Sequence, residues 1–170
     1  MKLRILLILL IGIFNKYNLA VAAQPEKLIT DQSLIVFLQD QVKAALAFNS
    51  GDFEYPLSRW LASENVTLFG GAGGTNKSIE SIAQRFRRAT SRYTEGSEVE
   101  IDFISIVSNG NLAYSVQIEK RKTKVDGMPE PIESSLRGTM IMQKVDNEWK
   151  VIHRHADPLV EFTPPRFLDN

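Results

Sequence analysis

The sequence predicts an α+β domain in which helices come first and a meander of long antiparallel strands follows. Apolar residues recur at helical spacing between Leu28 and Phe48, and again between Ile79 and Ala89. From Glu98 onward, apolar and polar residues alternate at period two, which is typical of strands with one buried face. This segregation along the chain favours helices packed on one face of an antiparallel sheet.

Local signals set the ends of these elements. Asp31 or Thr30 can cap the first helix, Gly51 suits the left-handed position after its end, and Ser78 opens the third helix. Tight hairpin turns are predicted at Asn109-Gly110 and around Asp146-Asn147. We expect a short second helix over 55–62 and strands over 66–69, 98–108, 112–118, 133–145 and 148–157.

The N-terminus has the pattern of a secretory signal peptide. A basic start precedes the apolar run Ile5–Phe14, which is too short to span a bilayer, and small residues follow. We expect cleavage after Ala22 or Ala23, which leaves one domain over 24–170. The protein is therefore expected to be exported to the periplasm or secreted, without a stable membrane anchor. An uncleaved N-terminal anchor is the alternative.

Composition narrows the possible partners. Three of the 20 basic residues lie in the predicted signal, so the mature chain has 20 − 3 = 17 against 20 acidic residues, a charge of about −3. Nothing here favours binding to nucleic acid. The chain contains no cysteine, which excludes disulfides and thiol chemistry.

The last predicted strand contains both histidines of the protein. Side chains alternate along a strand, so Trp149, Val151, His153, His155 and Asp157 are predicted to share one face. A face that begins apolar and ends in histidine and aspartate is typical of the wall of a partly polar pocket. A histidine paired with the aspartate could act as a general base, and plain ligand contact is the alternative. No third histidine is available, and we predict neither a metal nor a cofactor.

The placement of Arg137 depends on the neighbouring hairpin. A two-residue turn at 146–147 pairs Lys144 with Trp149 and separates Arg137 from the histidines. A three-residue turn at 145–147 shifts the parity and places Arg137 on their face. We favour the three-residue turn because it gathers Arg137 into one polar cluster.

Other side chains are candidates for the core or the pocket. Trp60, Phe69, Phe86, Phe103 and Tyr114 are predicted to be mainly core, and Trp60, Tyr114 and Tyr93 are candidate ligand contacts at the pocket. The arginines at 85, 87, 88 and 92 form a basic end to the third helix. They either lie in solvent, where positive charge near the helix C-terminus is favourable, or Arg85 or Arg88 binds an anionic ligand. We predict that the glycine-rich turn at 70–74 is a flexible connection. A phosphate-binding loop is the less favoured alternative, because the turn lacks the residue spacing of known phosphate-binding motifs. Residues 120–124 are predicted to be an exposed strand end.

The sequence resembles the SnoaL-like branch of the nuclear transport factor 2-like superfamily in four segments, Phe48–Asp52, Trp60–Gly70, Ser78–Ala89 and Trp149–Asp157. The resemblance covers nearly all of the mature chain and implies a cone, with three N-terminal helices packed on a curved antiparallel sheet around a pocket. It also implies a frequent dimer through the sheet. Members include isomerases, cyclases, dehydratases, non-enzymatic transport factors and oligomerisation domains, so the fold does not decide the function.

Three functions remain open. The first is an exported domain that binds a small organic ligand. The second is an isomerase, dehydratase or cyclase using the His/Asp cluster, although Thr67–Gly71 lacks the carboxylate that the resemblance would place there in a ketosteroid isomerase. The third is a non-catalytic dimerisation module. Apolar residues on both faces of the strand near Ile104 predict a homodimer, since helices cover only one face.

Overall fold

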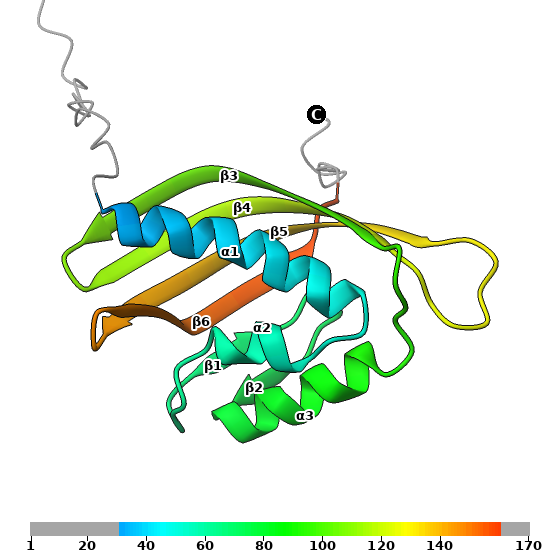
Figure 1. Cartoon of the computed structure of the whole chain (residues 1–170), viewed down its shortest axis with the longest axis horizontal. Helices are drawn as coiled ribbons and strands as arrows, with labels where there is room; N and C mark the ends of the chain where they lie inside the picture. Colours follow the sequence, from blue (N-terminus) through cyan, green and yellow to red (C-terminus); the bar gives the residue numbers. More distant parts are fainter. Residues whose placement is uncertain (1–30, 161–170) are drawn as a thin grey trace, which may run out of the picture.

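The computed structural model describes residues 31–160, and the predicted signal peptide at 1–23 lies outside this range. Within it the helices are α1 (Gln32–Asn49), α2 (Glu54–Ser58) and α3 (Ile79–Thr90). The strands are β1 (Thr67–Phe69), β2 (Thr75–Lys77), β3 (Glu98–Asn109), β4 (Leu112–Thr123), β5 (Ile132–Val145) and β6 (Glu148–Pro158). The predicted α+β class is confirmed, with the helices on one side of a single curved sheet (Figure 1). None of the described helices is long and apolar enough to cross a membrane.

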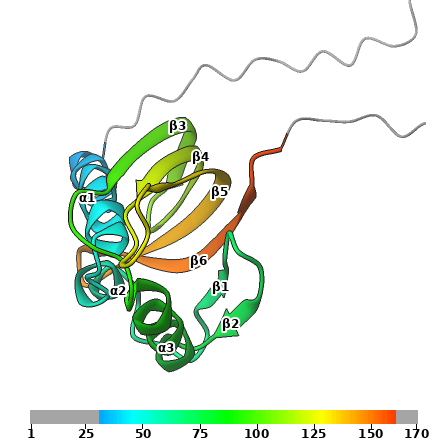
Figure 2. The same cartoon turned by 90° about the vertical axis from the view of Figure 1, so that its right-hand side faces the viewer.

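The six strands follow the order β2-β1-β6-β5-β4-β3. The long strands β3 to β6 form the predicted antiparallel meander, and they curl around α1 (Figure 2). Two features differ from the predicted sheet. Strand β1 runs parallel to β6, and the short β2 was not predicted. Strand β2 contains only polar residues, so its sequence has no hydrophobic alternation to signal it.

Helix α1 is fixed at both ends as its sequence predicts. The Asp31 carboxylate accepts from the backbone N–H of Ser33 and Leu34, which satisfies two free donors of the first turn. Lys144 Nζ of β5 reaches the same carboxylate at 3.1 Å. After the helix, Gly51 adopts a φ of +100°, which a residue without Cβ accepts at low cost.

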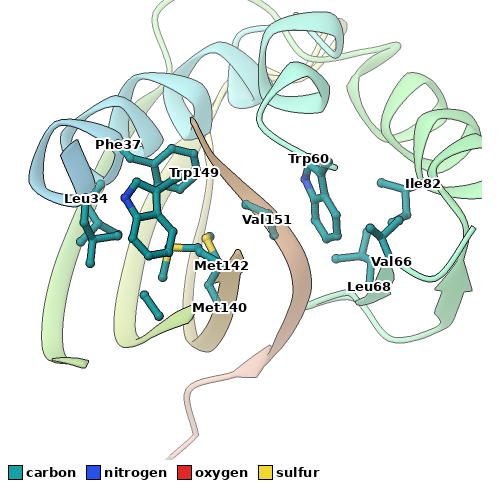
Figure 3. Packing of buried hydrophobic residues seen from close by; sticks show 12 residues of the cluster. Leu34, Phe37, Trp60, Val66, Leu68, Ile82, Met140, Met142, Trp149 and Val151 are labelled. Carbon is teal, nitrogen blue, oxygen red and sulfur yellow. The ribbon is translucent and has the colours of Figure 1, made fainter. Parts of the chain in front are cut away.

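The hydrophobic core lies between the helices and the concave face of the sheet, and Val151 of β6 stands at its centre (Figure 3). On one side of Val151, Trp149 packs with residues of α1. On the other side, Trp60 packs with residues of β1 and α3 (Figure 3). The buried cluster comprises Leu34, Phe37, Leu38, Trp60, Val66, Leu68, Ile82, Ala113, Met140, Met142, Trp149 and Val151.

A β-bulge in β6 decides which side chains face the helices. Met142 pairs with Val151, but the preceding residue Ile141 pairs with His153, so Ile152 has no partner on β5. One extra residue reverses the inside-outside alternation beyond it. Val151 therefore faces the core, and so does Arg154, while His153 faces outward.

The β5–β6 turn differs from the one that we favoured. Lys144 pairs with Trp149 across a two-residue turn, and Asp146 and Asn147 have φ of +50° and +66°. These left-handed values at both central positions match the tight hairpin turn that aspartate and asparagine favour. Arg137 does share a face with the histidines, but the bulge at residue 152 brings it there, and that face is the outer one.

Candidate functional site

A cavity of about 290 Å³ opens between α1, α3 and the concave face of the sheet. Its apolar wall includes Phe48 and Phe86, whose ring centroids lie 5.1 Å apart in an edge-to-face arrangement, and Trp60, 6.2 Å from Phe86. The further apolar lining comprises Ala44, Ala45, Pro56, Leu68, Ala89, Ile101, Leu136, Met140 and Val151. The opposite wall is polar.

The polar wall begins on β4, where alternation points Ser115, Gln117 and Glu119 inward. Ser115 Oγ donates to Gln117 Oε1 at 3.1 Å, and Gln117 Nε2 donates to Glu119 Oε1 at 2.7 Å. All three side chains are fully buried. The ladder therefore fixes the Glu119 carboxylate at the polar side of the cavity.

Two arginines compensate the buried charge of Glu119. Arg154 Nη2 donates to Glu119 Oε1 at 2.7 Å, and Arg121 Nη2 donates to Glu119 Oε2. Burial of Glu119 opposes its ionisation, but the charges of Arg154 and Arg121 and the hydrogen bonds outweigh it and hold the pKa of Glu119 at about 2. The carboxylate is thus ionised at neutral pH and is a weak base, suited to positioning the two guanidinium groups.

Arg85 of α3 closes another side of the cavity by lying across the glycine-rich turn. Its Nη2 donates to the Gly73 carbonyl at 2.6 Å and its Nη1 to Asn76 Oδ1 at 3.2 Å. A Cβ at Gly70 would lie 2.1 Å from Arg85 Nη2, so a larger residue there would displace the guanidinium group from this position. The turn joins β1 to β2, which confirms its reading as a connection.

The structure places His153, His155 and Asp157 away from this cavity. All three follow the bulge and lie on the outer face, so their predicted position in the pocket wall is wrong. Phe69 of β1 also lies outside, with its ring 5.4 Å from that of His153 and 5.5 Å from that of His155. Without the bulge, the alternation of side chains along β6 would turn the histidines inward and Arg154 outward. With the bulge, Arg154 faces inward instead.

These outer-face groups form a surface cluster with some internal bonding. His153 Nδ1 and Thr67 Oγ1 share a hydrogen bond of 2.7 Å. Partial burial and the neighbouring His155 lower the pKa of His153, against a smaller opposing contribution from Thr67. Asp157 lies 3.7 Å from His155 Nε2 and pairs with Arg137, whose side chain is 60 % exposed. Arg137 therefore belongs to this surface cluster and not to the cavity.

The remaining predicted ligand contacts divide between the two faces. Trp60 and Tyr93 line the cavity, as expected. Tyr114 was placed at the pocket rim, but it lies on the outer face of β4, where it pairs with Ile141. Arg121 belongs to the predicted exposed strand end, yet its side chain is largely buried against Glu119.

Sequence reasoning missed the polar wall for an identifiable reason. On β4, the apolar residues Leu112, Tyr114, Val116 and Ile118 carry the stronger alternation, and Tyr114 of this set was predicted to lie in the core or at the pocket rim. The structure turns that set outward and the polar set inward. The available signal was the run Ser115-Gln117-Glu119-Arg121, a polar alternation with two opposite charges at its end.

Solved structures with the same fold include three bacterial proteins. A candidate dehydratase of the nuclear transport factor 2-like family from Streptomyces avermitilis has a TM-score of 0.64 and 14% identity, over 76% of this chain and 95% of that one. A ketosteroid isomerase-like protein from Erwinia carotovora atroseptica has a TM-score of 0.60 and 12% identity, over 77% of this chain and 99% of that one. A candidate calcium/calmodulin-dependent protein kinase II association domain from Xanthomonas campestris has a TM-score of 0.62 and 18% identity, over 76% of this chain and 88% of that one.

At these identities the likeness establishes the fold and leaves the activity open. No curated protein matches the chain. The SnoaL-like domain family, in contrast, matches residues 41–161, which include the second half of α1, the helices α2 and α3, the glycine-rich turn and the whole meander. The chain therefore belongs to the SnoaL-like family, and it has the same fold as a protein of the nuclear transport factor 2-like family.

Proposed function

We propose that this SnoaL-like domain binds a small organic molecule in the cavity between α1, α3 and the sheet. The observation that carries the proposal is the combination of an aromatic wall with a buried, hydrogen-bonded polar wall around about 290 Å³ of space. Small-molecule sites typically enclose ~300–1,000 Å³ and have mainly apolar walls with a few convergent polar groups. This cavity matches that description at its lower size limit.

Binding is favoured over acid–base catalysis by the protonation behaviour of the cavity. A general base works best when its pKa lies near the operating pH, but the pKa of Glu119 is about 2. The histidines and Asp157 lie on the outer face and do not line this cavity. Catalysis by that cluster stays a prediction.

We further propose that the domain acts outside the cytoplasm, periplasmic or secreted, and as a homodimer. The first part rests on the signal pattern of residues 1–23. The second rests on the outer face of the sheet, where Ile104, Val107, Leu112 and Tyr114 are exposed. Apolar groups gathered on one uncovered face are typical of protein interfaces.

Native mass spectrometry of protein purified from its own host tests the proposed binding. We expect a retained small molecule on the wild type. Ala89→Phe would fill the cavity from α3 and abolish the retained mass, whereas Ala83→Phe, on the same helix but away from the cavity lining, would keep it. Retention of the same mass by a folded Ala89→Phe variant would contradict a ligand in this cavity.

A further inference from the structure

The polar wall of the cavity has a charge that the protein does not neutralise. Arg121 and Arg154 both donate to Glu119, so two positive charges face one negative charge and leave one positive charge. Both guanidinium groups are largely buried, with 16 % and 15 % of their side chains exposed. Arg85 adds a further positive charge at the cavity edge. An excess positive charge in a partly enclosed site attracts an anion.

Unsatisfied donors point to the same kind of ligand. Among the described residues, Gln41 Nε2 and Arg121 Nε are buried nitrogen atoms without a hydrogen-bond partner, and both residues line the cavity. Gln41 is 8 % exposed and comes from α1, facing the sheet that carries Arg121. Buried donors without acceptors are costly, so a ligand that brings acceptor oxygens would relieve both.

Resting on the proposed function, we infer that the ligand is a small amphipathic organic carboxylate. Its carboxylate would accept from the free donors of Arg121, Arg154 and Gln41. Its apolar body would lie against the aromatic wall of Phe48 and Phe86. A guanidinium group offers paired N–H donors that match the two oxygens of a carboxylate. One negative charge neutralises the excess charge of the arginine–glutamate cluster.

Glu119 positions the arginines and does not contact the carboxylate in this arrangement. It occupies one donor of each guanidinium group, which leaves the others available. It also disfavours ligands with several negative charges, because the carboxylates of Glu119 and of the ligand repel each other. A monocarboxylate therefore fits better than a dianion such as a phosphate monoester.

Isothermal titration of the whole protein with 3-phenylpropanoate and its neutral analogue 3-phenylpropanamide at pH 7 tests this inference. The two probes share size and apolar body and differ in charge. We expect the acid to bind at least about tenfold more tightly, since charge-assisted hydrogen bonds are roughly twice as strong as neutral ones. Equal binding of both probes would overturn the carboxylate inference and leave the proposed function standing. Binding of neither probe at millimolar concentration would contradict both.

Three variants separate the cavity from general surface charge. Arg121→Gln should reduce the preference for the acid to less than about threefold, whereas Arg137→Gln, at the exposed arginine of the outer face, should leave it unchanged. Gln41→Leu covers the case in which loss of Arg121 prevents folding. It removes an unsatisfied donor, so we expect an unchanged or higher melting temperature together with weaker binding of the acid. A full preference for the acid in a folded Arg121→Gln variant and in Gln41→Leu would overturn the inference.

Discussion

Glu119 of β4 and Arg154 of β6 meet at 2.7 Å although β5 runs between their strands. The two side chains meet over Gly138 of β5, which has no side chain to separate them. Gly138 pairs with Gln117 on one side and with Ala156 on the other. A Cβ at Gly138 would lie 3.3 Å from Glu119 Oε1. A glycine on the inner face thus gives the carboxylate room to reach across a strand, and it couples β4 to β6 through side chains.

The charge of Glu119 should be essential for stability. Glu119→Gln leaves two largely buried arginines without their counter-charge, and removing one partner of a buried ion pair costs about 3–5 kcal/mol. We expect a large fall in the free energy of unfolding measured by urea denaturation. Glu133→Gln is the matched control, because that glutamate pairs with Lys122 in an exposed position, and its effect should stay within about 0.5 kcal/mol. Equal small effects in both variants would contradict a structural role for the Glu119 cluster.

Acid should weaken the fold through the same carboxylate. The pKa of Glu119 is about 2 in the folded protein against an ordinary value of 4.5, so the folded state binds fewer protons. Its contribution, up to roughly 3 kcal/mol, is present above pH 4.5 and is lost as the pH falls toward 2. The gap in unfolding free energy between wild type and Glu119→Gln should therefore shrink between pH 5 and pH 3. A gap that stays constant over that range would be incompatible with this linkage.

Space at Gly138 should matter more than strand propensity. Valine favours strands, but at position 138 it would press on the Glu119 carboxylate, and overpacking in a core costs about 1–3 kcal/mol. We expect Gly138→Val to lower the melting temperature. The neighbouring Thr139→Val, on the outer face beside His155, serves as control and should be nearly neutral. If Gly138→Val were as stable as the wild type, the crossing of β5 by Glu119 would not need this glycine.

The outer face of the sheet predicts a dimer in solution. Val107 of β3 is 45 % exposed on this side and pairs with the exposed Tyr114 of β4. Sedimentation velocity at micromolar concentration should show a dimer, and Tyr114→Glu should shift the protein to monomer. Met128→Glu, in the β4–β5 loop, should keep the dimer. A wild type that sediments as a monomer would refute this interface.

The sequence predicted the elements well where a local signal exists. The caps of α1 and α3 come from Asp31 and Ser78, whose side chains accept from the first backbone N–H groups. These contacts span only a few residues, so the pattern alone defines them. The class of fold follows from the same local patterns.

The site was harder to predict because it depends on parity across bulges. The extra residues, Ile152 in β6 and Ile104 in β3, are isoleucines and look like ordinary strand residues. One unpaired residue exchanges the faces of every residue beyond it, so His153 and Arg154 change places. On β4, the hydrophobic pattern also pointed to the wrong face of the strand. An apolar outer face has the same two-residue period as a face buried in the core, so the pattern alone cannot distinguish them.

A crystal structure of the protein with 3-phenylpropanoate would show directly where an organic carboxylate binds. We expect the carboxylate within hydrogen-bond distance of Arg121 and Arg154, with the phenyl ring against Phe86 and His153 remote from it. The contradicting result would be a compound bound against the outer face at His153, or a histidine in place of Arg154 on the cavity wall.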